Sequence, residues 1–553
     1  MFKKMLSIVI ASLFCLATFS GCGNKSEGDA FAKDGKSIYS VVTNKSNYRL
    51  AEKFVKSFKE KTGILLNIKY DSATETEKEI LFGKTERGAI EQELYVGYQV
   101  KSVGSKIYFT GTDNEQLIAA GERFINDFST FSKTDGTSVT LTKKLDISHS
   151  TDELMTNLPY YLPGGVYDIG NDSKEVCMLN ATANDFANYC KKLEDIDYSL
   201  YASNEIVDNK YKTYLSETHK VTVKYINRLP SLLVAIEKRG ALENKPEDYQ
   251  RVTTTQLTQV NLIHETNQDG MSYLYRLADG RFIAIDGGFH ESNGKQASHF
   301  YDLLTNQNVL EGKPVIALWI ITHPHEDHIG MFTDFLERYS ESVVIEKIAM
   351  DISADEYTSK GDSAYQLKSN ELGTIPRMRT AIQTYASKVP ILKFHGGQKI
   401  TIADAEIEIL YTLSDMLPST VTDRELNATS TIFTITVANN KTIYLGDAMP
   451  IECDELVAMY GNYLKSDIMQ LAHHGYNGAT KQIYQTINPV VGLWPSNPTA
   501  IPSNSKFEYN KWLIENQTTK ELLVSGYYEF VLPLPYAPTN VDITDKFLNK
   551  PVD

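Results

Sequence analysis

The feature that most constrains this chain is an apolar run followed at once by a cluster of histidines and carboxylates. The run Val315–Ile321 predicts a buried strand. Residues 322–328 follow it and contain three histidines, one glutamate and one aspartate. Because α/β sheets usually carry their chemistry on the loops at the carboxyl ends of strands, this segment predicts a functional site.

The residue types in this segment indicate a metal site. Imidazole nitrogen and carboxylate oxygen suit zinc, with manganese as the alternative metal. Residues two apart point the same way in an extended segment, so we expect His323 and His325 to bind one ion. Asp327 and His328, past a bend, are expected to reach a second ion. The alternative, a solvated polar loop, is disfavoured because the whole chain of 553 residues has only 11 histidines.

The pattern His-x-His-x-Asp-His resembles the signature of the metallo-β-lactamase superfamily. Three further segments resemble that family in order and spacing: residues 281–288, which end in Asp286-Gly287-Gly288; residues 442–447, which end in Asp447; and residues 467–475, which contain His473 and His474. The resemblance covers roughly residues 255–535. It implies an α/β fold, a four-layer αβ/βα sandwich with the metal at one edge of two paired sheets.

The resemblance also implies roles for individual residues. Asp447 would bridge two ions, and Asp286 would support the metal loop from below unless it is a simple turn aspartate. Either His473 or His474 would be a metal ligand, and the other would hydrogen-bond to a ligand residue or touch substrate. Asp327 would be catalytic, either as a ligand of the second ion or by orienting and deprotonating the attacking water.

Within the superfamily, Asn427-Ala428-Thr429-Ser430 and residues 487–495 resemble the competence-type branch, which includes the extracellular hydrolase domain of the DNA-uptake channel. Most two-metal members carry a further histidine between the first metal motif and the bridging aspartate. Its place would be near Tyr411, and the interval contains only His395, which precedes a turn. We therefore expect this third histidine to be absent, which leaves open whether one ion or two are bound.

The first residues predict the location of the protein. Lys3 and Lys4 precede an apolar run that is too short for a membrane span, which is typical of a secretory signal over residues 1–21. Phe19-Ser20-Gly21-Cys22 resembles the bacterial lipobox, so we expect lipid on Cys22 and a polar tether over residues 22–35. An ordinary cleaved signal is the alternative. The prediction is a protein anchored by lipid on the extracytoplasmic side of the cell membrane.

The remaining length predicts three folded domains. Residues 36–135, with a helix over Tyr48–Thr62, resemble accessory α/β domains of secreted carbohydrate-active enzymes, which implies glycan contact or a spacer role. Residues 138–247 predict a small α/β sandwich, with one strand over residues 207–213. Residues 252–540 form the expected metal domain.

Three cysteines remain after Cys22, namely Cys177, Cys190 and Cys453. They are widely spaced and show no Cys-x-x-Cys pair, so we interpret them as buried thiols. A bridge between Cys177 and Cys190 is the alternative.

These features favour a lipid-anchored, metal-dependent hydrolase that cleaves phosphodiester bonds with a metal-activated water. The substrate would be nucleic acid or an envelope polymer such as teichoic acid, and the net charge of −15 disfavours a surface that tracks a polyanion. The alternative is a non-catalytic envelope protein whose degenerate metal site supports glycan or partner binding.

Overall fold

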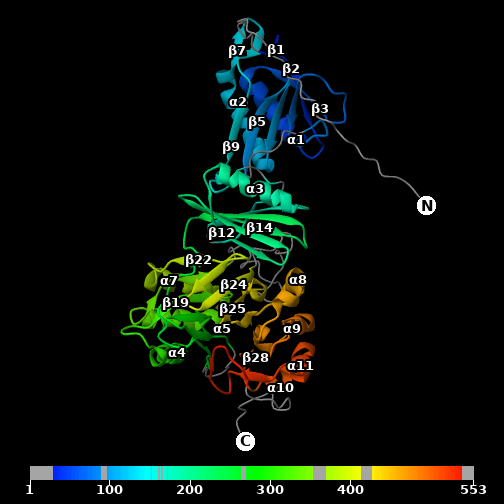
Figure 1. Cartoon of the computed structure of the whole chain (residues 1–553). Helices are drawn as coiled ribbons and strands as arrows, with labels where there is room; N and C mark the ends of the chain where they lie inside the picture. Colours follow the sequence, from blue (N-terminus) through cyan, green and yellow to red (C-terminus); the bar gives the residue numbers. More distant parts are fainter. Residues whose placement is uncertain are drawn as a thin grey trace, which may run out of the picture. The chain divides into compact units, whose positions relative to one another are not determined.

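The computed structural model describes residues 29–88, 96–150, 152–159, 162, 166–170, 172–262, 270–352, 369–412 and 426–538. The predicted signal and Cys22 lie outside these residues. The chain divides into two compact units, residues 1–92 with 96–151, and residues 93–95 with 152–553 (Figure 1). None of the helices in the described ranges combines the length and apolar character needed to cross a membrane.

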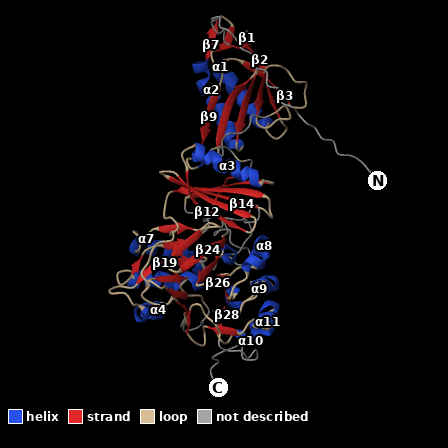
Figure 2. Cartoon of the chain, viewed as in Figure 1, coloured by secondary structure: helices blue, strands red, loops and turns tan. Residues whose placement is uncertain are grey.

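The first unit is a nine-stranded sheet with two helices, α1 and α2 (Figure 2). Its strands are β1 (Asp29–Lys33), β2 (Lys36–Thr43), β3 (Leu65–Tyr70), β4 (Glu79–Phe82), β5 (Gly97–Val103), β6 (Lys106–Gly111), β7 (Ser132–Asp135), β8 (Ser138–Leu141) and β9 (Asp146–Ser150). The helix α1 (Tyr48–Thr62) covers the residues expected to be helical, and α2 (Asn114–Phe131) is the second. Phe54, Phe58 and Phe124 lie in the core between sheet and helices.

This sheet takes in more of the chain than the accessory domain expected over residues 36–135. β1 pairs with β2 and β8, and β9 pairs with β5. The unit therefore ends after Ser150, at Thr151.

The second unit begins with a six-stranded antiparallel sheet in the order β10-β11-β15-β14-β13-β12. Its elements are β10 (Val166–Asp168), β11 (Ser173–Leu179), α3 (Ala183–Asp195), β12 (Ser199–Ile206), β13 (Asn209–Leu215), β14 (His219–Ile226) and β15 (Ser231–Lys238). The strand expected over residues 207–213 is wrong at its start. Val207 has a φ of 58° in the tight turn between β12 and β13, which a β-branched residue rarely adopts and which local pattern did not indicate.

The cysteines behave as small apolar residues. Cys177, Cys190 and Cys453 are free and buried in the described structure, so the alternative of a bridge between Cys177 and Cys190 is wrong. Burial raises the pKa of Cys177 and of Cys453 to about 12.

Two further sheets form the C-terminal domain. The first is eight-stranded, with β16 (Gln256–Gln259), β17 (Tyr273–Arg276), β18 (Phe282–Ile285), β19 (Val315–Ile321), β20 (Val344–Ile345), β21 (Ile348–Met350), β22 (Ile391–Lys393) and β30 (Phe530–Pro533). The second is seven-stranded, with β23 (Lys399–Ile402), β24 (Ala405–Tyr411), β25 (Ile432–Val437), β26 (Asn440–Tyr444), β27 (Ile468–Gln470), β28 (Val491–Trp494) and β29 (Glu521–Val524).

Three apolar cores define the layers of this domain. One core lies between the two sheets and joins residues such as Tyr273 and Leu318 to Phe433 and Tyr444. A second lies between the first sheet and α4 (Lys295–Gln307), α5 (Glu326–Tyr339) and α7 (Ser369–Tyr385). A third lies between the second sheet and α8 (Pro450–Tyr460), α9 (Lys481–Ile487) and α11 (Glu508–Glu515). The predicted four-layer αβ/βα sandwich is therefore confirmed; α10 (Ile501–Asn504) is a short addition.

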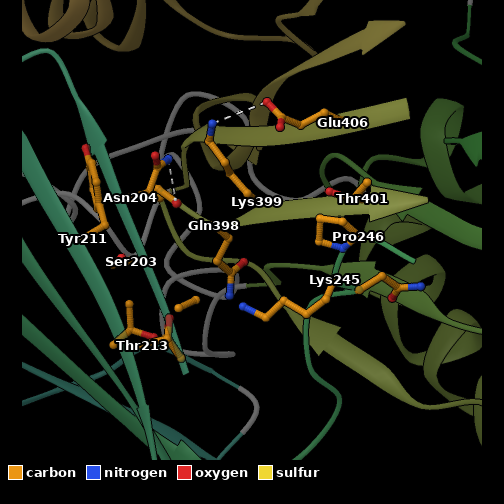
Figure 3. Close-up of a pocket in the computed structure, with 15 residues that line it drawn as sticks. Ser203, Asn204, Tyr211, Thr213, Lys245, Pro246, Gln398, Lys399, Thr401 and Glu406 are labelled. Atoms are coloured by element: carbon orange, nitrogen blue, oxygen red, sulfur yellow. Dashed lines mark hydrogen bonds and ion pairs between the residues drawn. The ribbon is translucent and has the colours of Figure 1, made fainter. Parts of the chain in front are cut away.

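The six-stranded sheet packs against this sandwich through one continuous core. Tyr211 and Leu233 of the sheet lie in the same apolar cluster as Tyr460 of α8, and the Tyr211 and Tyr460 hydroxyls are 2.8 Å apart. Beside this core lies a cavity of about 180 Å³ (Figure 3). Asn204 crosses the joint there, donating to Glu408 Oε1 at 2.8 Å.

A buried ion pair completes this joint. Lys220 Nζ of β14 lies 2.7 Å from Glu237 Oε1 of β15, and His395 Nε2 of the C-terminal domain lies 3.2 Å from the same oxygen. Burial lowers the pKa of His395, so the Lys220 ammonium is the main partner. Although burial opposes it, this ammonium lowers the pKa of Glu237 to about 2.

This pair predicts a specific loss of stability in acid. Because the folded pKa of Glu237 is depressed, its contribution is present above the ordinary carboxyl pKa near 4.5 and is lost as the pH falls toward 2. In Glu237→Gln we expect that part of the pH dependence to disappear, a difference on the order of 3 kcal/mol at most. The free energy of unfolding, followed by tryptophan fluorescence between pH 5.5 and 3, measures it.

All three tryptophans lie in the second unit, so the fluorescence reports on this unit. Glu205→Gln removes an exposed carboxylate of β12 and is the control. Parallel pH profiles for Glu237→Gln and the wild type would contradict the assignment.

Candidate metal centre

The candidate site lies where the carboxyl ends of four strands meet. Asp286 follows β18, and residues 322–328 follow its parallel neighbour β19. Asp447 follows β26, and the turn with His473 and His474 follows its parallel neighbour β27. Parallel strands end at the same edge, so each sheet contributes two neighbouring loops to one site.

The structure brings the predicted residues together in two clusters that share one carboxylate. Asp327, His328, Asp447 and His474 form the first, with one donor atom of each within 4.8 Å of the others. His474 Nε2 is 3.0 Å from Asp327 Oδ2 and 3.5 Å from Asp447 Oδ2. His328 Nε2 is 3.3 Å from Asp447 Oδ1. We call this group the Asp327 cluster.

His323, His325 and Asp447 form the second group, the His323 cluster. His323 Nε2 is 3.1 Å from His325 Nδ1 and 3.7 Å from Asp447 Oδ2. His325 has the extended backbone that the sequence predicted, and it lies directly before α5. Asp327 and His328 occupy the first turn of that helix, which turns them away from His325 toward the other sheet.

Two imidazoles of the Asp327 cluster are fixed by partners on their far side. His474 Nδ1 donates to the carbonyl of Pro495 at 2.8 Å, so its proton lies on Nδ1 and its Nε2 faces the cluster. His328 Nδ1 lies 2.7 Å from Asp286 Oδ2. Such contacts orient a histidine and make it a better metal ligand. The resemblance did not decide whether His473 or His474 is the metal ligand. This geometry favours His474 as the ligand of the Asp327 cluster.

Asp286 is fully buried below the metal loop. Its two carboxylate oxygens accept from the Thr322 backbone N–H and the Thr322 hydroxyl, both at 2.7 Å. The Gly287 N–H donates to the carbonyl of His328 at 2.6 Å, which ties this loop to α5. A Cβ on Gly287 would lie 2.7 Å from the Phe332 nitrogen, so only glycine allows this approach.

His473 lies at the mouth of the site, with 26% of its side chain exposed. Its Nε2 is 4.0 Å from Asp447 Oδ2, so it belongs to neither cluster. His473 and His474 both have left-handed backbone, with φ of 51° and 54°. This conformation costs about 1–2 kcal/mol for each residue. It lets two consecutive imidazoles face the same carboxylate.

The charges of the site favour a cation. Although burial opposes it, the carboxylates of Asp447, Asp327 and Asp286 raise the pKa of His328 to about 10. Burial also opposes protonation of His474, whose pKa Asp447 and Asp327 hold well above its usual value. A divalent cation competes with these protons for the same nitrogens, so its affinity rises with pH.

The donor atoms fit a metal ion. His328 Nε2, Asp447 Oδ1 and His474 Nε2 are buried and none makes a hydrogen bond of acceptable geometry. Buried polar atoms are nearly always paired, so three unpaired donors in one cluster point to a missing partner. Imidazole and carboxylate donors at these spacings are those that zinc and its neighbours prefer.

The structure also shows which residues do not join the site. Tyr411, near the place of the absent histidine, lies in the apolar core with α8 and α9. His395 pairs with Glu237 at the joint described above. Neither therefore offers a nitrogen to the His323 cluster.

Two residues of the segment that resembles the competence-type branch contact the site. The Ser430 hydroxyl accepts from the Asp447 N–H at 2.9 Å and fixes the backbone that carries the shared carboxylate. Asn427 Nδ2 lies 3.4 Å from His473 Nε2. The sequence motif contains both residues, but nothing in the sequence predicted that Ser430 contacts Asp447 or that Asn427 contacts His473.

Comparison with known families agrees with this geometry. Residues 266–487 match the family described as Metallo-beta-lactamase superfamily. The C-terminal region of the chain is therefore a metallo-beta-lactamase superfamily domain, and this superfamily binds metal. No curated protein matches the chain.

Several solved structures are similar at low identity. One is CmlA, a diiron beta-hydroxylase from Streptomyces venezuelae, at 12% identity and a TM-score of 0.30, covering 54% of this chain and 55% of that chain. A point mutant of CmlA matches at the same identity and TM-score, covering 52% and 55%. Another is described as a possible metal-dependent hydrolase from Veillonella parvula DSM 2008, at 8% identity and a TM-score of 0.23, covering 49% and 85%. The chain spans about half the length of CmlA, and at these scores the likeness does not bear on activity.

The contact between Asp286 and His328 predicts the effect of a single charge. Asp286→Asn keeps an acceptor but removes the negative charge behind the imidazole, so we expect zinc affinity to fall about 10- to 100-fold. Competition of the purified full chain with a chromophoric chelator measures it. Asp279→Asn, in the turn before β18, is the control and should bind zinc as the wild type does. Equal affinities for both variants would contradict the role of Asp286.

Proposed function

We propose that the protein is a zinc-dependent hydrolase that cleaves phosphodiester bonds. The observation that carries the proposal is the Asp327 cluster, in which buried imidazole and carboxylate donors converge without hydrogen-bond partners. The superfamily match supports metal-dependent hydrolysis. The donor set of imidazoles and carboxylates supports zinc, with manganese as the alternative.

A divalent ion in this site would supply a hydroxide at neutral pH and would stabilise negative charge on the substrate. The residues of the chain then divide the remaining work. Asp327 keeps 21% of its side chain exposed, so one carboxylate of the cluster can accept a proton from the attacking water. Asp447, at 1% exposure, is held by Ser430 and stays where it can serve both clusters.

The substrate proposal rests on the chemistry of two adjacent positions. If both are filled, two ions about 3.5 to 4 Å apart can stabilise the attacking and leaving oxygens of a phosphodiester. The competence-type resemblance around Asn427 and Ser430 supports nucleic acid. The lipobox supports an envelope polymer such as teichoic acid equally well.

A non-catalytic envelope protein is the second candidate, and one observation favours it. The His323 cluster contains two histidines and not three. Tyr411, near the expected place of the third, lies in the apolar core. Against it stands Asp327, which a purely structural site would not need to keep partly exposed. Glycan contact by the first unit stays a prediction, and the stacked rings of Tyr48 and Tyr70, 4.8 Å apart, are a surface that a sugar could use.

Removal of metal separates these candidates. We expect the full chain to hydrolyse bis-p-nitrophenyl phosphate, to lose that activity on chelation and to regain it with zinc. Asp327→Ala should lower kcat at least about a hundredfold, because it removes the proton acceptor. Glu326→Ala, the neighbouring carboxylate outside both clusters, is the control. A metal-loaded protein inactive on phosphodiesters, DNA, RNA and teichoic acid would favour the non-catalytic candidate.

We also propose that Cys22 carries the lipid that anchors the protein outside the cytoplasmic membrane. Cys22→Ala should lose the lipid and move the protein from the membrane fraction to the soluble extracytoplasmic fraction, because Cys22 is the residue proposed to carry the lipid. Radioactive palmitate incorporation and cell fractionation measure it. Ser20→Ala keeps the cysteine and should remain lipidated. Membrane retention of Cys22→Ala without label would contradict the anchor.

A further inference from the structure

The His323 cluster offers one donor fewer than a closed metal site requires. Its donors are His323 Nε2, His325 and Asp447 Oδ2, and zinc in proteins is usually four-coordinate. In catalytic sites three protein donors and one open position are common, but Asp447 is shared with the other cluster. A third nitrogen is therefore what this position lacks.

His473 presents a nitrogen beside the shared carboxylate. Its Nδ1 donates to the carbonyl of Asn477 at 3.2 Å, so its Nε2 carries the lone pair. That Nε2 lies 4.0 Å from Asp447 Oδ2. Donors bonded to one tetrahedral zinc at about 2.0 to 2.1 Å lie about 3.4 Å apart. His473 Nε2 must therefore move closer to Asp447 Oδ2 and to the two histidines of the cluster, since it lies outside the 4.8 Å that groups their donor atoms.

The Asn427 amide donates to this nitrogen. Its Nδ2 lies 3.4 Å from His473 Nε2, while its Oδ1 is buried and has no hydrogen-bond partner. Asn427 is only 6% exposed, so this amide oxygen is cut off from bulk water. On the other side of the ring, a Cβ on Gly478 would lie 2.7 Å from His473 Cβ, so the residue is closely packed.

We infer that His473 Nε2 is the missing nitrogen donor of the His323 cluster. The inference rests on the proposed function, because it needs a metal ion. The ion takes the lone pair that now faces the Asn427 amide. The two consecutive histidines then serve different ions, His474 in the Asp327 cluster and His473 in the His323 cluster, with Asp447 between them.

Metal stoichiometry tests this inference without any assay of activity. The full chain is dialysed against zinc, and bound zinc is counted by elemental analysis; a cobalt(II) titration gives the absorption of each position. The variants are His473→Ala and Asn427→Ala, and His149→Ala, an exposed histidine of the first unit, is the control. Tryptophan fluorescence checks that the second unit of each variant is folded, and circular dichroism checks the first unit, which contains no tryptophan.

We expect two zinc ions in the wild type and in His149→Ala, and one in His473→Ala. Asn427→Ala should keep two ions and bind the weaker one at least as tightly as the wild type, because the amide no longer competes for the lone pair of His473 Nε2. Two ions bound with unchanged affinity in His473→Ala would overturn the inference and leave the proposed function standing. A wild type that saturates with one ion, lost in Asp327→Ala, would also overturn it. No bound zinc in the wild type would overturn both.

Discussion

Asp447 is the residue on which the site depends, because its carboxylate is shared by both clusters. Nitrogens of His323, His328 and His474 lie between 3.3 and 3.7 Å from its oxygens. A buried carboxylate needs compensating charge, and these imidazoles can supply it only as cations or as co-ligands of a metal. The Ser430 hydroxyl fixes its backbone, so the geometry of the centre follows from one residue after β26.

The layers of the fold serve this geometry. Each sheet brings two parallel strand ends to one edge, and the core between the sheets holds these edges against each other. Asp286 and the Pro495 carbonyl then orient two imidazoles from behind. The six-stranded sheet is tied to the same domain by a shared core and by the contact of His395 with Glu237.

Local pattern predicted some elements well and others poorly. The run Val315–Ile321 is β19, and its continuous apolar sequence matches its nearly continuous burial. Tyr48–Thr62 is α1, and its apolar residues recur at the spacing of one buried helix face. The strand expected over residues 207–213 crosses a turn, since Val207 adopts a positive φ that its side chain disfavours. Local sequence pattern also did not predict the extent of the first sheet, because β1 and β9 pair with strands that are distant in the sequence.

The sequence by itself determined the chemistry: which side chains bear donors, their order along the chain, and the absence of a histidine near Tyr411. The tertiary structure decided which donor faces which. It set His474 into the Asp327 cluster and left His473 at the mouth, through a left-handed turn and the carbonyls of Pro495 and Asn477. The physical reason is that the direction of an imidazole depends on the partner of its other nitrogen, and that partner is fixed only when the chain is folded.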